Sequence, residues 1–244
     1  MLKRLVRSVV PAPMLRAWRR HASERIDRRF TGLSPADVFG TVYREKMWGV
    51  VPNSDYCSGT GSHQGHLVTP YVTRVRAFLE SFSKPPDAVD LGCGDFNVGS
   101  LLRDRCAQFV AADVVPELVE RNARAFAQLA VSFRCLDIVT EELPSGEVGF
   151  LRQVLQHLTN AQITAVVPKL YTYRWLVVTE QLPSQLQFPA NRDKPIGPGV
   201  RERYGSGVVL TRPPFGLQAK EEQVLCTTRD QSGCIHTVAY RLRD

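Results

Sequence analysis

Apolar and polar positions follow two different periods along the chain, and each period predicts a different kind of element. Short apolar runs of strand length predict strands at residues 88–91, 109–113, 131–135, 147–151, 174–179 and 235–242. Apolar residues at helical spacing predict helices at residues 68–82, 116–129 and 161–171, with others beginning at Pro35 and Val98. Strands that alternate with helices predict an α/β fold with a parallel sheet and helices on both faces.

The strand at 88–91 runs directly into a glycine turn. Gly92 and Gly94 flank Cys93, and Asp95 follows. Glycines permit a sharp turn and close approach of a ligand, and a glycine turn between strand and helix is typical of a nucleotide pocket. A dinucleotide site expects a third glycine where Asn97 stands, and a pyrophosphate is repelled by an adjacent acid. The turn therefore favours a cationic, phosphate-free ligand such as S-adenosylmethionine (SAM).

Residues 89–95, Val-Asp-Leu-Gly-Cys-Gly-Asp, resemble the first motif of the class I SAM-dependent methyltransferases, and the resemblance extends over residues 88–180. It implies a Rossmann-like, seven-stranded, mostly parallel sheet with an N-terminal helical cap and a last strand inserted antiparallel. It also implies SAM as the cofactor, S-adenosylhomocysteine (SAH) as the product, and a glycine turn under the methionine half of SAM.

Acids stand at the ends of three successive predicted strands, as Asp95, Asp113 and Asp137. Asp113 lies about twenty residues after the glycines, the separation expected of an acid that binds ribose hydroxyls. By resemblance, Asp137 contacts the adenine amino group and Ile138 lies against the ring. The predicted cofactor-binding residues are Asp90, Gly92, Cys93, Gly94, Asp95, Asp113, Val114, Asp137, Ile138 and Gln153.

The stretch 152–158, after the fourth core strand, borders the transferred methyl group in this family. Methyl transfer is an in-line displacement, so the protein supplies orientation, desolvation and, for a hydroxyl acceptor, a base. His157 is our candidate base because an ordinary imidazole pKa of about 6.5 suits this task; a structural role is the alternative. Gln153 is a second candidate, which orients the acceptor without titrating. Glu180 is either a further catalytic acid at the rim or a surface charge.

Two segments outside the core are predicted to contact the acceptor. The glycine-rich loop 48–62 begins with a tryptophan and is either a cap over the site or a linker. Residues 182–218 contain six prolines and five glycines, and a connection this long favours a lid over disorder. The predicted acceptor-binding residues are Trp48, His63, Arg192, Asp193, Arg201 and Tyr204. The predicted organisation is a basic arm (1–30), a helical cap (31–84) and a SAM-binding domain (85–244) with the lid at about 182–218.

The net charge of +7 comes from the first thirty residues, which hold nine basic and two acidic side chains. The remaining chain is neutral, which argues against a nucleic-acid partner. We expect the basic arm either to contact an anionic membrane surface or glycolipid, or to pack on the body or a partner. Six cysteines without a CxxC pair favour a cytoplasmic location, peripheral to the membrane if the arm binds it. No metal site is predicted, because no histidines stand at i, i+4 with an acid.

We therefore expect O-methylation of a saccharide or another small polar hydroxyl acceptor, since the Trp-Gly and Ser-Gly-x-Gly-Ser run resembles methyltransferases encoded beside polysaccharide and glycolipid genes. Methylation of nitrogen or of another metabolite is an alternative, as is a non-catalytic SAM-binding partner subunit. An NAD-type oxidoreductase is a third alternative, against which Asn97 and Asp95 argue. The sequence leaves the oligomeric state open.

Replacing Asp113 with alanine is expected to weaken SAM binding severely, because the ribose hydroxyls lose their carboxylate acceptor. Calorimetric titration of the purified variant measures this directly. An Asp113→Ala protein with wild-type affinity for SAM would remove Asp113 from the binding site.

Overall fold

The computed structural model describes residues 14, 21–22, 24–52, 54–185, 187–230 and 233–244. Its α-helices are α3 (Pro35–Arg44), α4 (Thr60–His63), α5 (Gly65–Glu80), α6 (Pro116–Ala125) and α7 (Asn160–Val166). Its strands are β1 (Ala88–Leu91), β2 (Phe109–Asp113), β3 (Ser132–Cys135), β4 (Val148–Arg152), β5 (Trp175–Pro183), β6 (Glu221–Arg229) and β7 (Gly233–Arg241). Short 3₁₀ segments are η2 (Arg28–Phe30), η3 (Gly99–Leu101), η4 (Arg103–Arg105), η5 (Ala127–Leu129), η6 (Leu155–His157), η7 (Val167–Thr172) and η8 (Arg201–Tyr204).

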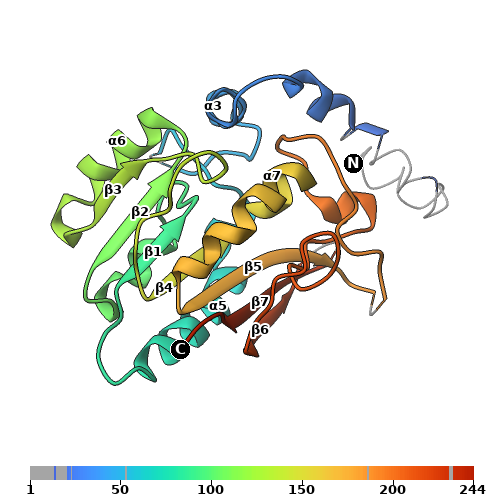
Figure 1. Ribbon diagram of the computed structural model, residues 1–244. Coiled ribbons are helices and arrows are strands. Elements are labelled where there is room, and N and C mark those ends of the chain that lie inside the picture. Colours follow the sequence, from blue (N-terminus) through green and yellow to red (C-terminus); the bar gives the residue numbers. More distant parts are fainter. Residues whose placement is uncertain (1–13, 15–20, 23, 53, 186, 231–232) are drawn as a thin grey trace.

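The seven strands form one sheet in the order β3-β2-β1-β4-β5-β7-β6 (Figure 1). β1 to β5 are parallel, and β7 lies antiparallel between β5 and β6. This confirms the predicted seven-stranded, mostly parallel sheet with its inserted antiparallel strand. The chain reverses its crossover direction between β1 and β4, and ligands of open α/β sheets bind at such a switch point.

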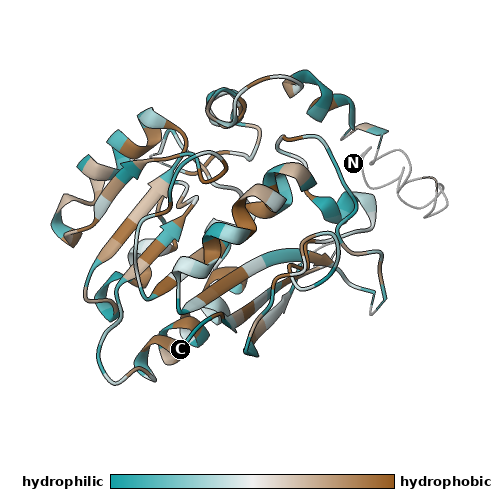
Figure 2. Ribbon diagram, in the orientation of Figure 1, coloured by the Kyte–Doolittle hydropathy of each residue, from teal (hydrophilic) through white to brown (hydrophobic). Residues whose placement is uncertain are grey.

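Alternating side chains of the strands pack on two separate apolar layers. One layer joins residues such as Phe109 and Phe150 to α5, and the other joins Leu151 and Leu176 to α7. In Figure 2 the hydrophobic colour is concentrated in the strands and α7, whereas the N-terminal helix is mainly hydrophilic. Burial on both faces explains why the central strands read as short continuous apolar runs.

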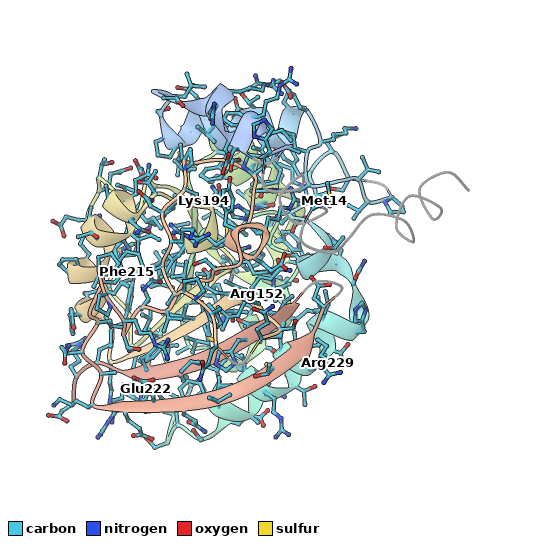
Figure 3. All side chains as sticks on the ribbon, turned by 90° about the vertical axis from the view of Figure 1, so that its right-hand side faces the viewer. Met14, Arg152, Lys194, Phe215, Glu222 and Arg229 are labelled. Atoms are coloured by element: carbon cyan, nitrogen blue, oxygen red, sulfur yellow. The ribbon has the colours of Figure 1, made fainter. Side chains whose placement is uncertain are left out.

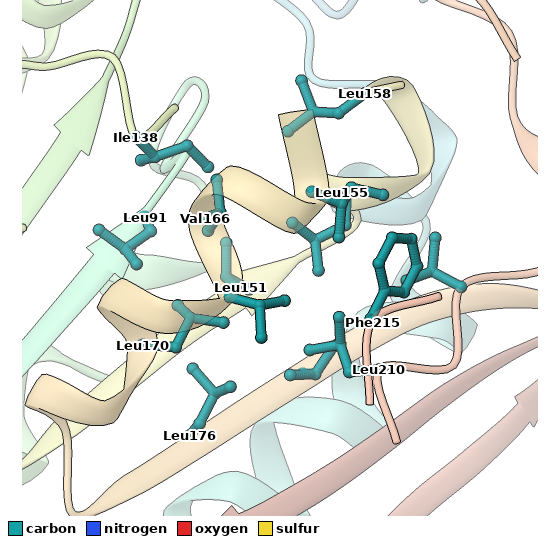
Figure 4. Close-up of a cluster of buried hydrophobic side chains, with 14 of the residues drawn as sticks. Leu91, Ile138, Leu151, Leu155, Leu158, Val166, Leu170, Leu176, Leu210 and Phe215 are labelled. Carbon is teal, nitrogen blue, oxygen red and sulfur yellow. The ribbon is translucent and has the colours of Figure 1, made fainter. Parts of the chain in front are cut away.

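Residues 184–220 do not stand apart from this core. Leu210 and Phe215 of this segment are buried against Leu155 in the layer that covers α7, as Figure 4 shows. Asn191 is also buried, and its side-chain amide donates to the carbonyl oxygens of Val209, Arg212 and Pro213. Residues 187–220 therefore form a wall of the molecule.

The predicted helix beginning at Val98 is wrong, since two 3₁₀ turns, η3 and η4, fill that position. Phe96 takes a left-handed φ of 60°, and Gly99 is a poor helix former, so the chain coils tightly here. The predicted helices at 116–129 and 161–171 each end early in a 3₁₀ segment, because Phe126 and Pro168 interrupt them.

Three other outcomes concern the chain's edges. Strand β6 was not foreseen, because its residues are mostly exposed and charged at both ends, as an edge strand tolerates. The start of α3 at Pro35 is confirmed, with the Ser34 hydroxyl accepting from the Asp37 amide. Most of the basic arm predicted at 1–30 lies outside the described residues. Within the described part of the chain, no helix has the length and apolarity needed to cross a membrane.

Replacing Leu151 with alanine is expected to lower the free energy of unfolding by about 2–5 kcal/mol, because this fully buried side chain of β4 leaves a cavity beneath α7. Urea unfolding measures the change. Val224→Ala, on the exposed face of β6, is the matched control and is expected to cost less than about 0.5 kcal/mol. Equal losses in the two variants would contradict this account of the core.

Candidate active site

A cavity of about 370 Å³ opens at the carboxyl ends of β1, β2 and β4, between the sheet and the N-terminal helices. Its volume lies in the range of ligand sites. All ten predicted cofactor-binding residues line it, together with His157 and Trp48. Lining residues that sequence reasoning did not single out include Tyr43, Ser58, Tyr71, Arg152, Val154 and Arg203.

The glycine turn is held in place by the acid that ends β2. Asp113 is buried, and its carboxylate accepts hydrogen bonds from the amides of Gly94 at 2.9 Å and Val115 at 3.1 Å. From α6, the buried Asn122 side chain donates to the Gly94 carbonyl oxygen at 2.7 Å. Gly94 has a φ of 57°, a conformation that glycine adopts without strain. The turn is thus preformed around the Asp113 carboxylate.

Asp90 presents a buried carboxylate to the cavity. No hydrogen bond to this carboxylate forms within the part of the chain that the structure describes, although Arg152 lies near enough to oppose its protonation electrostatically. Burial raises the pKa of Asp90 to about 7, with the neighbouring Asp113 adding to the effect. A buried carboxylate without a hydrogen-bonded cation favours a cationic ligand, because the ligand's positive charge stabilises the ionised form of the carboxylate.

Asp95 lines the cavity and also contacts the cap loop (residues 48–62). Its carboxylate accepts from the Ser58 amide at 2.9 Å and from His63 Nε2 at 2.6 Å, and its own amide donates to Ser58 Oγ. Tyr43 extends this set, its hydroxyl lying 3.0 Å from Ser58 Oγ. The sequence predicts that Asp95 binds the cofactor and His63 the acceptor. In the structure Asp95 lines the cavity, and its hydrogen bond with His63, which is not among the lining residues, fastens the loop to the turn.

Arg152, at the end of β4, fastens the same loop from the other side. Its guanidinium donates to the Gly61 carbonyl oxygen at 2.6 Å and to Ser62 Oγ at 3.2 Å, and lies over the Tyr71 ring. A Cβ on Gly61 would lie only 2.1 Å from Gln153 Oε1, so any larger residue there would displace the Gln153 side chain. The sequence signal for this contact was the glycine-rich composition of 48–62, which did not identify its partner.

Asp137 and Ile138 follow β3 at the far end of the cavity, beside Val114 and Leu136. The Asp137 carboxylate accepts from the Val139 amide at 2.8 Å and from the Thr140 hydroxyl at 3.0 Å, which holds the turn that presents Ile138. An apolar slot with a carboxylate at its edge suits a flat heteroaromatic group that carries a hydrogen-bond donor.

His157 lies in the opposite wall, with its ring centroid 5.0 Å from that of Trp48 and the two ring planes tilted by 43°. Its Nδ1 is 3.2 Å from the Gly197 carbonyl oxygen, which can only accept, so Nδ1 carries the hydrogen and Nε2 the lone pair. Burial first, and then the charge of Lys194, lower the pKa of His157 to about 3. The expected pKa near neutrality was therefore wrong: the ring stays neutral and is a weaker base than an exposed histidine.

Glu180 does not line the cavity. Its buried carboxylate accepts from the amides of Leu155 at 3.0 Å and Gln156 at 3.1 Å, and burial raises its pKa to about 8. It therefore supports the backbone that carries His157 from behind. Gln153, by contrast, lines the cavity and has a left-handed φ of 57°, a strained conformation of the kind found at functional sites.

The four predicted acceptor-binding residues of the 184–220 segment do not line the cavity. Arg201 is fully buried and donates to the Leu158 carbonyl oxygen at 2.5 Å. Asp193 accepts from the Asn160 amide at 2.8 Å, and Arg192 donates to the Tyr204 carbonyl oxygen at 3.1 Å. These side chains hold the segment in shape, while its Pro198, Val200 and Arg203 reach the cavity. Among the described residues, no group of three His, Cys, Asp or Glu side chains is placed to hold a metal ion.

No protein-family model and no curated protein sequence matches the chain. Solved structures do match its fold. The N-methyltransferase NodS of Bradyrhizobium japonicum WM9, in complex with SAH, has a TM-score of 0.57 at 15% identity, over 75% of this chain and 91% of that one. A SAM-dependent methyltransferase of Leishmania major has a TM-score of 0.59 at 17% identity, over 82% of each chain. The N-terminal domain of EvdMO1, determined in the presence of SAH and D-fucose, has a TM-score of 0.52 at 15% identity, over 92% and 97%.

The chain has the class I methyltransferase fold. The cavity of this methyltransferase fold also fits the methyl donor of that class. One end offers the buried carboxylates of Asp90 and Asp113, and the other the apolar slot at Ile138. Between them, a Cβ added to Gly92 would lie 2.6 Å from Val154 Cγ2, so only glycine keeps the turn this close to the opposite wall.

Replacing Asp95 with alanine is expected to loosen the cap loop rather than remove a ligand contact. The Ser58 amide loses its acceptor, at a cost of about 1–3 kcal/mol, so its hydrogen exchange accelerates correspondingly. Asp137→Ala is the matched control, since that carboxylate bonds only within its own turn and leaves Ser58 untouched. If hydrogen exchange of the Ser58 amide were unchanged in Asp95→Ala, the hydrogen bond between Ser58 and Asp95 would not stabilise the loop.

Proposed function

We propose that this protein is a SAM-dependent methyltransferase that methylates a hydroxyl group of a saccharide or another small polar acceptor. The assignment of SAM as the cofactor is based on the positions of Asp90, Asp113 and Asp137. These carboxylates come from the ends of three successive parallel strands and line one cavity. A diphosphate cofactor would be repelled by this arrangement, whereas a cationic cofactor with a ribose is favoured by it. The SAM and SAH bound in proteins of this fold give further support.

SAM, when bound, supplies a methyl group on a positively charged sulfur. Asp90 would hold its α-ammonium group, Asp113 its ribose hydroxyls, and Asp137 with Ile138 its adenine. Asp113 already accepts two backbone hydrogen bonds, and each carboxylate oxygen has a further lone pair for a hydroxyl. The chain therefore binds the donor with preformed groups and little rearrangement.

The acceptor half of the cavity combines aromatic surface with hydrogen-bonding groups. Trp48 packs against Phe39, Tyr43 and His157, and its indole donates to the Pro198 carbonyl oxygen at 3.3 Å. Gln153, Gln156 and Arg203 line the same region. Flat aromatic faces beside polar side chains suit a sugar, which has apolar C–H faces and a rim of hydroxyls. The D-fucose present with EvdMO1 favours a saccharide, whereas NodS favours nitrogen.

His157 orients the acceptor in this proposal. Its ring stays neutral throughout the physiological pH range, and its Nε2 lone pair accepts from the Gln156 side-chain amide at 3.4 Å, a contact that the acceptor hydroxyl would replace. As the oxygen–carbon bond forms and the carbon–sulfur bond breaks, the hydroxyl becomes acidic, and its proton passes to Nε2 and then to water. Because the ring is a weak base, orientation and desolvation contribute more of the rate than proton removal before the displacement.

The decisive experiment incubates the protein with SAM and a panel of neutral sugars, uronic acids, sugar phosphates and amines, and measures SAH release. Product analysis by mass spectrometry and NMR then locates the methyl group. Methylation of a sugar oxygen would support both the cofactor and the acceptor that we propose. Methylation of an amine alone would contradict the proposed hydroxyl acceptor. If calorimetry detected NAD binding and no binding of SAM or SAH, the cofactor assignment would be wrong.

SAH affinity is expected to fall about tenfold per pH unit below pH 7, because the α-ammonium group requires ionised Asp90 and the free protein holds this carboxyl at a pKa of about 7. As the pH falls through 7, Asp90 becomes protonated in the free protein, and SAH binding must then remove that proton. The affinity for SAH is therefore lost on the acidic side of pH 7. Calorimetry between pH 5 and 7 measures this slope. Asp90→Asn should bind SAH weakly and without the slope; a wild-type affinity that is flat with pH would contradict this role of Asp90.

A further inference from the structure

The wall behind His157 is formed by the loop at 194–199, and the two are linked in both directions. The Gly197 amide donates to the His157 carbonyl oxygen at 3.1 Å, and His157 Nδ1–H donates to the Gly197 carbonyl oxygen at 3.2 Å. The position of this loop therefore decides which ring nitrogen carries the hydrogen. A displaced Gly197 would free Nδ1 and allow either tautomer.

A buried ion pair fastens this loop to the N-terminal part of the chain. Lys194 Nζ lies 3.5 Å from the Asp27 carboxylate, and both side chains are completely buried. Lys194 Nζ also donates to the carbonyl oxygens of Pro195 and, at 3.5 Å, His157. In Figure 3 Lys194 lies beneath the N-terminal ribbon. The ammonium group thus contacts both the N-terminal segment and the backbone of His157.

Asp27 holds the loop at two further points. Its carboxylate accepts from the Gly199 amide at 3.2 Å and from the Tyr204 hydroxyl at 3.2 Å. A Cβ on Gly197 would lie 2.5 Å from Asp27 Oδ1, so the loop backbone approaches the carboxylate as closely as a glycine permits. Nothing in the fold of the sheet requires these contacts, because Asp27 lies 61 residues before β1 begins.

The stability of the fold gives no sufficient reason for such a pair. Desolvation of two charges offsets most of their attraction, and buried pairs are often replaceable by apolar residues without loss of stability. Buried ion pairs fix geometry more reliably than they add stability, and here the geometry fixed is that of His157. Lys194 also acts through its charge, since together with Arg203 it opposes protonation of the ring.

Other charged groups around His157 are further from the ring or already bound. Glu180, from β5, binds the amides of Leu155 and Gln156, and Arg201 lies beside Glu180. From the N-terminal side, the ring meets only the uncharged side chains of Phe39 and Trp48.

We propose that Asp27 and Lys194 are positioning residues for the methyl transfer: together they hold His157 as the neutral Nδ1–H tautomer. Its Nε2 lone pair accepts from the Gln156 side-chain amide at 3.4 Å, a contact that the acceptor hydroxyl would replace. This role in catalysis rests on the proposed function, whereas the state of the histidine ring does not. In this proposal Asp27 supports the acceptor wall from behind, although it is not itself among the residues that line the cavity.

The test is ¹⁵N NMR of the full-length protein labelled at histidine, with the His157 signals assigned by a His157→Gln variant. Wild type should show an Nδ1–H ring that stays neutral down to about pH 4. Lys194→Met should raise the midpoint of His157 titration by about one pH unit or more and give a mixture of tautomers. Lys220→Met, which breaks an exposed ion pair with Asp244, is the control and should leave the His157 signals unchanged.

The double variant Asp27→Asn, Lys194→Met leaves no uncompensated buried charge and keeps the test available if the single variant unfolds. A folded variant that retains the wild-type tautomer and titration of His157 would overturn the proposal. SAH affinity separates the two proposals: these variants should bind SAH within about twofold of wild type, since neither residue lines the cavity. Failure of wild type to bind SAH would instead overturn the proposed function, while the NMR result would still decide the role of Asp27 and Lys194.

Discussion

The hydrogen bonds between the Asp113 carboxylate and the amides of Gly94 and Val115 are the constraint on which the site depends. β1 and β2 run parallel and in register, so their carboxyl ends meet at one edge of the sheet. There the carboxylate ties the start of the β1 turn to the end of β2, and Asn122 secures the turn from α6. The other walls of the cavity lie around this junction. The cap loop (residues 48–62) contacts it through Ser58 and Asp95, and the wall that contains His157 lies opposite.

This junction concentrates negative charge where water is scarce. Asp90, Asp95 and Asp113 lie close together and buried, and burial raises the pKa of Asp90 and Asp113. The acids are compensated unequally among the described residues: Asp95 accepts from His63 and from the backbone amides of Ser58 and Asn97, whereas Asp90 accepts no hydrogen bond there and is opposed in its protonation by the charge of Arg152. Such residual electrostatic imbalance is characteristic of binding sites, because a ligand of opposite charge relieves it.

The acceptor half follows a different principle, since its parts come from segments far apart in the chain. Trp48 precedes the sheet, His157 follows β4, and Pro198 lies between β5 and β6, yet the indole–carbonyl hydrogen bond joins the first to the third. The buried Glu180 carboxyl and the buried Asp27–Lys194 pair support this wall from behind. In the proposed function, the part of the cavity that would hold SAM is formed by the strand ends and the turns that follow them, and the part that would hold the acceptor by the elements packed against the sheet.

Local patterns in the sequence were sufficient to predict six of the seven strands and the glycine turn, because strand period and glycine spacing are short-range properties. The antiparallel insertion of the last strand and the role of Ile138 were implied by the family resemblance, and β6 was missed. Local patterns and the resemblance together located Gly92, Gly94, Asp113 and Ile138 at one cavity before any contact was known. They failed where long-range packing sets the outcome. Whether Glu180 faces the cavity, which partner Asp95 takes, and how strongly burial lowers the pKa of His157 depend on chain segments tens to more than a hundred residues away, and only the tertiary structure brings those segments together.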